Sequence, residues 1–201
     1  MSIALHKGDS INIAKKDGSA ITQLCVGVNW GAMTKKGLFG KPKRVAVDLD
    51  ASCITYNANK EVLELVYYGK LTATGIKHSG DDITGDTDGD DGLDNEVIMV
   101  DLPAIDANAQ QIVFVLNSFQ NHDFKDIPFA SIRLYEGSPT QVDNVLATYD
   151  IANDPQFAGA TSLVLGKITR QAQQWRFDAI GAITHDNKLE STVKTVQRDF
   201  L

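Results

Sequence analysis

The sequence predicts an all-β fold: an antiparallel β-sandwich of two sheets with a short C-terminal helix. Apolar, strand-like segments recur along the chain, and clusters of turn-forming residues separate them. Strands do not alternate with amphipathic helices, which argues against a parallel α/β sheet. Only residues 188–200 carry apolar side chains at helical spacing. We expect residues 1–201 to form a single domain, because this length suits one sizeable hydrophobic core.

The strands expected in the first half of the chain cover residues 2–5, 10–14, 21–30, 45–56 and 61–71. Gly8 separates the first two, and the turn-forming residues 16–19 follow them. The third strand (ITQLCVGVNW) and the fourth (VAVDLDASCITY) are strongly apolar. In the fourth, alternation places Val47 on one face and Asp48 and Asp50 on the other.

The strands expected in the second half cover residues 97–102, 111–119, 129–135, 146–151, 162–168 and 174–183. Pro103 ends the first of them, and the nearly continuous apolar run of 111–119 (QIVFVLNSF) indicates a central strand. The last two form a hairpin around residues 171–173. The final stretch has an apolar stripe at helical spacing, made of Leu189, Val193, Val196 and Phe200. We expect this helix to pack on the body of the domain.

A basic segment, residues 31–44 (GAMTKKGLFGKPKR), joins the third and fourth expected strands. Its cations are Lys35, Lys36, Lys41, Lys43 and Arg44. The simpler interpretation is a solvated, mobile connection. The functional alternative is a contact with an acidic partner or with a lipid surface.

Composition limits the classes of function. The sequence pI of about 5.0 argues against nucleic-acid binding, which needs a basic face. The first residues, MSIALHKGDS, lack the basic leader and long apolar run of a signal peptide, and no segment is long enough to span a membrane. Cys25 and Cys53 lie in apolar strands and are interpreted as small buried hydrophobes. We therefore expect a cytoplasmic protein with reduced thiols.

Negative charge is concentrated in residues 78–96 (HSGDDITGDTDGDDGLDNE), a segment without Lys or Arg. Its eight carboxylates belong to Asp81, Asp82, Asp86, Asp88, Asp90, Asp91, Asp94 and Glu96. Removing these eight from the 26 acidic residues of the chain leaves 18 against 19 basic ones, so the net charge of −7 originates here. A bound cation is the simplest local cause, because crowded carboxylates repel by roughly 1 kcal/mol per pair at 4 Å even in water.

The residue types in this segment favour calcium. Calcium takes about 6–8 oxygen ligands, and the interspersed glycines let the backbone turn tightly around an ion. The segment has no Cys and only one imidazole, His78, which argues against zinc or copper. The helical EF-hand pattern does not fit, because Asp91 stands where a loop starting at Asp86 needs Gly. The alternative is a solvated acidic run that binds nothing.

Asp48 and Asp50 are open to two interpretations. They lie one pleat apart in an otherwise apolar strand. They either cap the end of that strand or approach the acidic segment and complete its site. Spacing alone favours neither.

Seven motifs follow one another along nearly the whole chain. They are VGVNW (26–30), VDLDASCI (47–54), HSGDDITGDTDGDD (78–91), IVFVLNSF (112–119), ASIRLYEG (130–137), ATYDI (147–151) and GKITRQAQQWRFDAIG (166–181). Together they resemble the TerD family of bacterial tellurium-resistance and stress proteins, and within it the TerZ-like members. The acidic motif and the LDAS-type strand are the most specific of the seven.

The resemblance implies a two-sheet β-sandwich that binds two calcium ions and has no established enzymatic activity. The metal ligands that it implies are Asp48, Asp50, Asp81, Asp82, Asp88, Asp90, Asp91 and Glu96. It therefore favours the two strand aspartates as ligands, which spacing alone left open.

Three features depart from the family pattern. Gly31 stands where the family usually has Asp, residues 92–95 interrupt the acidic run, and Asp82 stands where Asn is usual. A ligand missing at Gly31 would weaken one ion site. Whether Asp86 or Asp94 is a ligand stays open.

The implied function is a calcium-stabilised interaction module of a bacterial stress response, with other proteins of the same system as partners. One alternative is a metal-dependent hydrolase that uses the same carboxylates. No nucleophile elbow, phosphate loop or zinc-helix motif supports it. The other alternative is calcium-dependent membrane docking, with candidate contacts at Lys35, Lys36, Phe39 and Lys41.

Overall fold

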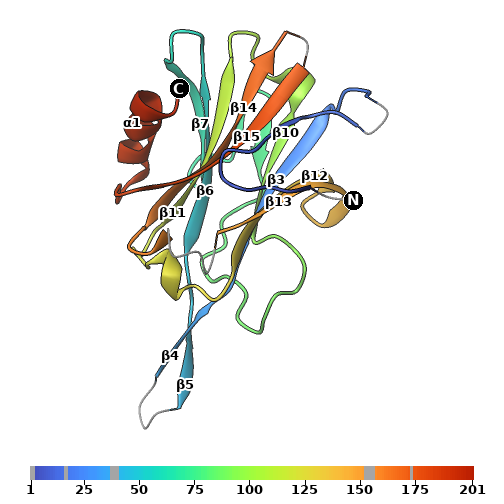
Figure 1. The fold of residues 1–201 in the computed structure, drawn as a ribbon. Helices are drawn as coiled ribbons and strands as arrows, with labels where there is room; N and C mark the ends of the chain where they lie inside the picture. The colour runs from blue at the N-terminus through green and yellow to red at the C-terminus, as the bar shows by residue number, and fades with distance from the viewer. Residues whose placement is uncertain (1–2, 16–17, 37–40, 152–156, 173) are drawn as a thin grey trace.

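The computed structural model describes residues 3–15, 18–36, 41–151, 157–172 and 174–201. These residues form two large β-sheets packed face to face, with one α-helix, α1 (Leu189–Asp199), on the outer face of one sheet (Figure 1). The predicted all-β sandwich with a C-terminal helix is confirmed. No helix among the described residues is long and apolar enough to cross a membrane.

The first sheet has seven strands, and its pairs are antiparallel except for β1 with β13. Their order is β1 (Ile3–Ala4), β13 (Gln141–Asp150), β12 (Ala130–Ser138), β3 (Gln23–Trp30), β10 (Glu96–Asp101), β9 (Ile76–His78) and β8 (Thr72–Ala73). The neighbours β9 and β10 matter most for function, because the acidic segment connects them.

The second sheet has six strands, and all of its pairs are antiparallel. Their order is β2 (Ser10–Asn12), β15 (Gln174–Thr184), β14 (Ser162–Gln171), β11 (Gln111–Ser118), β6 (Leu49–Tyr56) and β7 (Val62–Val66). β11 has a partner on both sides, as predicted for a central strand. Two short 3₁₀ helices, η2 (Leu102–Ala104) and η3 (Phe124–Asp126), lie in the connections.

The hydrophobic core lies between the two sheets, because each strand turns alternate side chains inward. Val28 and Trp30 enter it from β3, and Leu49 and Ala51 enter it from β6. Asp50 lies between the last two in sequence and therefore faces the outer side of its sheet, as the sequence pattern predicts.

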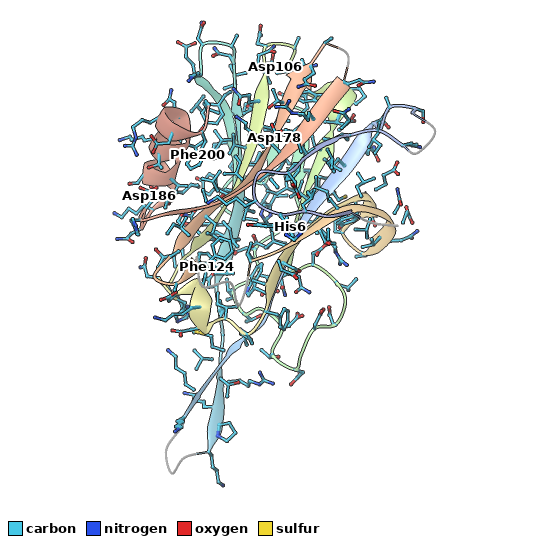
Figure 2. The ribbon with its side chains drawn as sticks, in the orientation of Figure 1. His6, Asp106, Phe124, Asp178, Asp186 and Phe200 are labelled. Carbon is cyan, nitrogen blue, oxygen red and sulfur yellow. The ribbon has the colours of Figure 1, made fainter. Side chains whose placement is uncertain are left out.

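The helix α1 covers the outer face of the six-stranded sheet. Val196 is fully buried there in one cluster with Ile54 and Val115 of the sheet. Phe200, next to the end of the helix, packs against the same cluster (Figure 2). The prediction that the helix packs on the body of the domain is confirmed.

The two cysteines pack as predicted. Cys25 and Cys53 are free and buried. Burial raises the pKa of the Cys25 thiol to about 11 and also raises that of Cys53. Both thiols therefore stay protonated near neutral pH and serve as core side chains.

The basic segment differs from the prediction. Instead of an irregular connection, β4 (Met33–Lys36) and β5 (Pro42–Val45) pair as an antiparallel hairpin that extends away from the sandwich (Figure 1). Hydrophobic periodicity does not reveal this hairpin, because its side chains are mostly exposed cations and neither of its faces is apolar. Phe39, a predicted membrane contact, lies outside the described residues, as do Ser2 and Gln173 of other predicted segments.

Only Val62–Val66 of the predicted strand 61–71 forms a strand, β7. β7 ends at Val66, and Tyr67 and Lys70 then exchange two backbone hydrogen bonds of 2.9 and 3.1 Å across a tight turn. The chain crosses there to β8 in the seven-stranded sheet. The prediction of one continuous strand to residue 71 is wrong because the chain turns at Tyr68 and Gly69, and a Cβ on Gly69 would come within 2.6 Å of the Tyr67 ring.

Candidate metal centre

The acidic loop, defined here as residues 79–95, joins β9 to β10 at one end of the sandwich (Figure 1). The Asp86 N–H donates to the Trp30 carbonyl at 3.0 Å, and the Ala32 N–H donates to the Asp86 carbonyl at 2.9 Å. The Val47 N–H donates to the Thr84 carbonyl at 3.0 Å. The loop is thereby attached to the end of β3 in one sheet and to the entry of β6 in the other.

Trp30 fixes the middle of this loop. Its side chain is fully buried, and its indole Nε1–H donates to the Val47 carbonyl at 2.8 Å. Gly85 lies directly over the ring with a φ of +65°, and a Cβ there would come within 2.6 Å of the indole. Glycine is required at this position by both the backbone conformation and the space.

Glu96 is a buried anchor at the base of the loop. Its Oε2 accepts a hydrogen bond of 2.7 Å from the Ala51 N–H of β6, and its Oε1 accepts one of 3.2 Å from the Asp82 N–H. The His78 Nε2 lies 3.4 Å from the Glu96 Oε2. The His78 Nδ1 accepts from the Gly80 N–H, which places the ring hydrogen on Nε2, facing the Ala51 carbonyl at 3.1 Å.

The first acidic cluster consists of Asp48, Asp50 and Asp81, which offer carboxylate oxygens within 4.8 Å of one another. Asp48 and Asp50 are each only 7% exposed. Burial, and then the charge of neighbouring carboxylates, raises the pKa of Asp48 to about 6 and that of Asp50 to about 7. These carboxyl groups lie close together, and mutual repulsion of this kind is the electrostatic state that a cation relieves.

The second acidic cluster consists of Asp86, Asp90 and Asp91, again with carboxylate oxygens within 4.8 Å of one another. The Asn29 Nδ2 of β3 donates to the Asp90 Oδ1 at 3.0 Å. The Asn29 Oδ1 is buried and has no hydrogen-bond partner among the described residues. An unpaired amide oxygen next to the Asp90 carboxylate adds a ligand of the type that hard cations take.

Asn95 links the two parts of the loop. Its Nδ2 donates to Asp82 Oδ2 at 3.2 Å and to Asp86 Oδ1 at 3.1 Å, while its Oδ1 accepts from the Trp30 N–H at 2.7 Å. Asp82 also accepts from the Thr84 N–H at 2.8 Å. Burial opposes ionisation of Asp82, but these hydrogen bonds outweigh it and lower its pKa. The ionised Asp82 carboxylate therefore holds the loop in place through these hydrogen bonds.

Asp94 forms an ion pair with Arg133. Its Oδ1 lies 2.8 Å from the Arg133 Nε of β12, and the Arg133 Nη2 donates to the Gly92 carbonyl at 2.9 Å. Gly27 of β3 leaves room for this pair, because a Cβ there would come within 2.0 Å of the Asp94 carboxylate. The residues that interrupt the acidic run, 92–95, are thus held on the outer face of the seven-stranded sheet.

The structure sorts the predicted ligands into four groups. Asp48, Asp50 and Asp81 form the first cluster, and Asp90 and Asp91 belong to the second. Asp82 and Glu96 accept backbone hydrogen bonds instead, and Asp88 is exposed and belongs to neither cluster.

Residues outside the predicted set also contribute. Asp86, which the sequence left open, completes the second cluster. Asn29 and Asn95 were missed, although they lie within segments noted in the sequence, VGVNW and residues 78–96. At Gly31, where the family usually has Asp, the Phe129 ring fills the space, and a Cβ would come within 2.5 Å of it.

The comparison with known proteins agrees with this architecture. The model of the TerD domain matches residues 1–195. The chain belongs to the TerD family. Tellurium resistance protein TerZ of Serratia marcescens is 32% identical, with 89% of each chain covered. Stress response protein SCP2 of Bacillus subtilis is also 32% identical, over 96% of this chain and 98% of that one.

A solved structure shares the TerD-family fold. It is described as a homologue of telluride resistance protein (TerD) from Streptomyces coelicolor. Its TM-score to this chain is 0.64 at 19% sequence identity, covering 87% of this chain and 96% of that one. The likeness supports the sandwich architecture of the TerD family.

The donor atoms fit a hard metal ion. Both clusters present carboxylate oxygens, and the second adds the unpaired amide oxygen of Asn29. Neither cluster contains a Cys or His ligand. Oxygen donors without sulfur or imidazole suit calcium, magnesium or manganese rather than zinc or copper. Both clusters can therefore hold a metal ion.

Proposed function

We propose that this TerD-family protein is a calcium-binding, non-enzymatic module of a bacterial stress response associated with tellurium resistance. The observation that carries the proposal is the first cluster, in which Asp48 and Asp50 are almost completely buried beside Asp81. Three carboxylates in such a setting favour a divalent cation, because its charge offsets both their desolvation and their mutual repulsion.

Two ions fit the arrangement better than one. The clusters share no residue, and Asp82 and Asn95 stand between them as hydrogen-bonding partners. The first cluster takes Asp81 from the loop, Asp50 from β6 and Asp48 from the residue before β6. All three carboxylates of the second cluster come from the loop, and Asn29 of β3 donates to one of them. An ion in the first site therefore fixes the loop to the second sheet.

The proposed role is to order a surface rather than to perform chemistry. His78 lies beside Glu96 at the base of the loop, and its side chain is fully buried. Its ring accepts a hydrogen bond from the Gly80 N–H and faces the Ala51 carbonyl. It is not free to act as a general base. We infer that calcium rigidifies the acidic end of the molecule, which then contacts other proteins of the same stress system.

Thermal unfolding in EGTA, in excess calcium and in excess magnesium tests this function. An ion that binds only the folded state adds about 2.7 kcal/mol of stability at a hundredfold excess over its Kd. We expect a rise in Tm of several degrees with calcium and a much smaller one with magnesium. Equal Tm values under all three conditions would refute calcium binding.

Single substitutions separate the two sites. Asp50→Asn should raise the Tm in EGTA, because it removes a buried charge, and should reduce the gain on adding calcium. Asp90→Asn should reduce the gain through the second site alone. Asp88→Asn is the matched control, because this carboxylate is exposed and outside both clusters. A control variant that loses as much of the calcium effect as the other two would contradict the assignment.

A further inference from the structure

A pocket of about 470 Å³ opens on the outer face of the six-stranded sheet, beside the first turn of α1. Asp50 and Ser52 of β6 and Asn117 of β11 line it from the sheet. Asp50 and Asn117 are direct partners across the two strands, so their side chains stand next to each other on this face. The pocket therefore adjoins the first acidic cluster through Asp50.

Two buried polar atoms from this lining have no partner among the described residues: the Ser52 Oγ and the Asn117 Oδ1. Ser52 is fully buried and Asn117 is 8% exposed. Buried polar groups are almost always hydrogen-bonded, so these two atoms need a partner from outside the described residues, and a molecule bound in the pocket would supply it.

A chain of hydroxyl groups fixes the orientation of the Asn117 amide. The Thr192 hydroxyl donates to the Lys188 carbonyl at 3.3 Å, so its oxygen accepts from the Asn117 Nδ2 at 3.0 Å. The same Nδ2 donates to the Ser162 Oγ at 2.9 Å. The Oδ1 is therefore left as a hydrogen-bond acceptor, and the group that it lacks is a donor.

Aromatic side chains form the wall of the pocket. Tyr67, Tyr68 and Phe119 all line it. Tyr68 is 41% exposed and Phe119 is 60% exposed, and their rings meet edge to face with centroids 6.1 Å apart. Exposed rings of this size around a polar floor are typical of a binding site, and the face of each ring attracts cations.

The charges around the pocket favour a cation as well. Asp50 contributes a buried carboxylate at the floor, and Glu190 contributes an exposed one at the rim. Lys188 is the only basic residue of the lining among the described residues, and it is exposed. A carboxylate, an amide acceptor and aromatic faces together match an ammonium group, which offers several N–H donors and one positive charge.

We propose that this pocket binds a small organic amine, whose ammonium group lies against Asp50, Ser52 and Asn117 and whose apolar part packs on Tyr68 and Phe119. The volume suits a molecule of roughly ten to fifteen non-hydrogen atoms, at the small end of known ligand pockets. Asp50 also belongs to the first acidic cluster, so the amine and a divalent cation compete for its carboxylate. Each therefore lowers the affinity of the protein for the other by the same factor. This competition rests on the function proposed above, whereas the pocket itself does not.

Isothermal titration with 2-phenylethylamine and with its neutral isostere 2-phenylethanol tests the proposal, using the full chain in EGTA at pH 7. We expect the amine to bind at least tenfold more tightly than the alcohol. Tyr68→Ala and Phe119→Ala should each weaken the amine at least fivefold. Val62→Ala should leave it unchanged, because Val62 is an exposed apolar residue of the neighbouring β7 that does not line the pocket.

Added calcium should weaken the amine, and added amine should lower the calcium affinity by the same factor. Undetectable binding of the amine, equal binding of amine and alcohol, or full binding by both aromatic variants would each overturn the proposal. If wild-type protein instead binds the amine in EGTA but shows no calcium shift in its Tm, the calcium function fails and the amine pocket stands.

Discussion

Single side chains decide which carboxylates of the acidic loop remain available to a cation. Asp94 shows this best, because Arg133 removes it from the group of possible ligands. The carboxylate of Asp94 is 1% exposed and the Arg133 side chain is 22% exposed, so the pair is largely shielded from water. Burial raises the pKa of Asp94, and the hydrogen bond and charge of Arg133 act in the opposite direction.

Arg133→Ala should therefore destabilise the protein by about 2–3 kcal/mol, because it leaves a buried carboxylate without its partner. Urea unfolding in EGTA measures the change. Arg133→Ala combined with Asp94→Ala is the control, and it should recover part of the lost stability because no uncompensated charge remains. A double variant that is less stable than Arg133→Ala alone would show that packing, rather than charge, accounts for the loss.

At the scale of elements, the candidate metal centre depends on how the acidic loop is attached between β3 and β6. Trp30 is the common contact, since its ring lies under Gly85 and its indole N–H reaches the segment before β6. Both acidic clusters take ligands from this loop. A change that lifts the loop from the ring should consequently weaken both sites together.

Gly85→Ala should destabilise the fold by about 1–3 kcal/mol, because a Cβ would overlap the Trp30 ring and the backbone φ is +65°. The calcium-dependent rise in Tm should also shrink. Gly80→Ala is the matched control: its φ is +129°, but a Cβ there meets nothing within 4 Å. Equal effects of the two substitutions would mean that backbone strain alone, without the indole contact, holds the loop in place.

The sequence predicts the parts of this site that depend on local pattern. Alternation in an apolar strand was enough to place Asp50 on the outer face of its sheet, and charge density was enough to locate the loop. Asp48 precedes β6, so strand alternation does not account for its position. The role of Asp94 depends on Arg133, which lies 39 residues away and reaches it only through the pairing of β12 with β3 and of β3 with β10. The amide bridges of Asn95 likewise need the folded loop. Long-range register of this kind is not visible in one sequence.

For the whole molecule, the concentration of negative charge at one end couples stability to pH. The pKa values of Asp48 and Asp50 in the folded protein are about 6 and about 7, above the ordinary value of 3.8. The folded state therefore binds more protons than the unfolded state between these values. Stability in the absence of a cation is accordingly greater at low pH and falls as the pH rises through about 6 and 7.

We expect the free energy of unfolding in EGTA to decrease between pH 5 and pH 8, and calcium to reverse this trend. Calcium binds the ionised carboxylates, so its effect grows over the same pH interval in which the metal-free protein loses stability. Urea unfolding at pH 5, 6, 7 and 8, with EGTA and with calcium, measures both trends. Asp50→Asn should flatten the decrease in EGTA, because the group with the highest pKa in the cluster no longer titrates. A decrease of unchanged size in that variant would place the responsible proton elsewhere and contradict the electrostatic account of the first cluster.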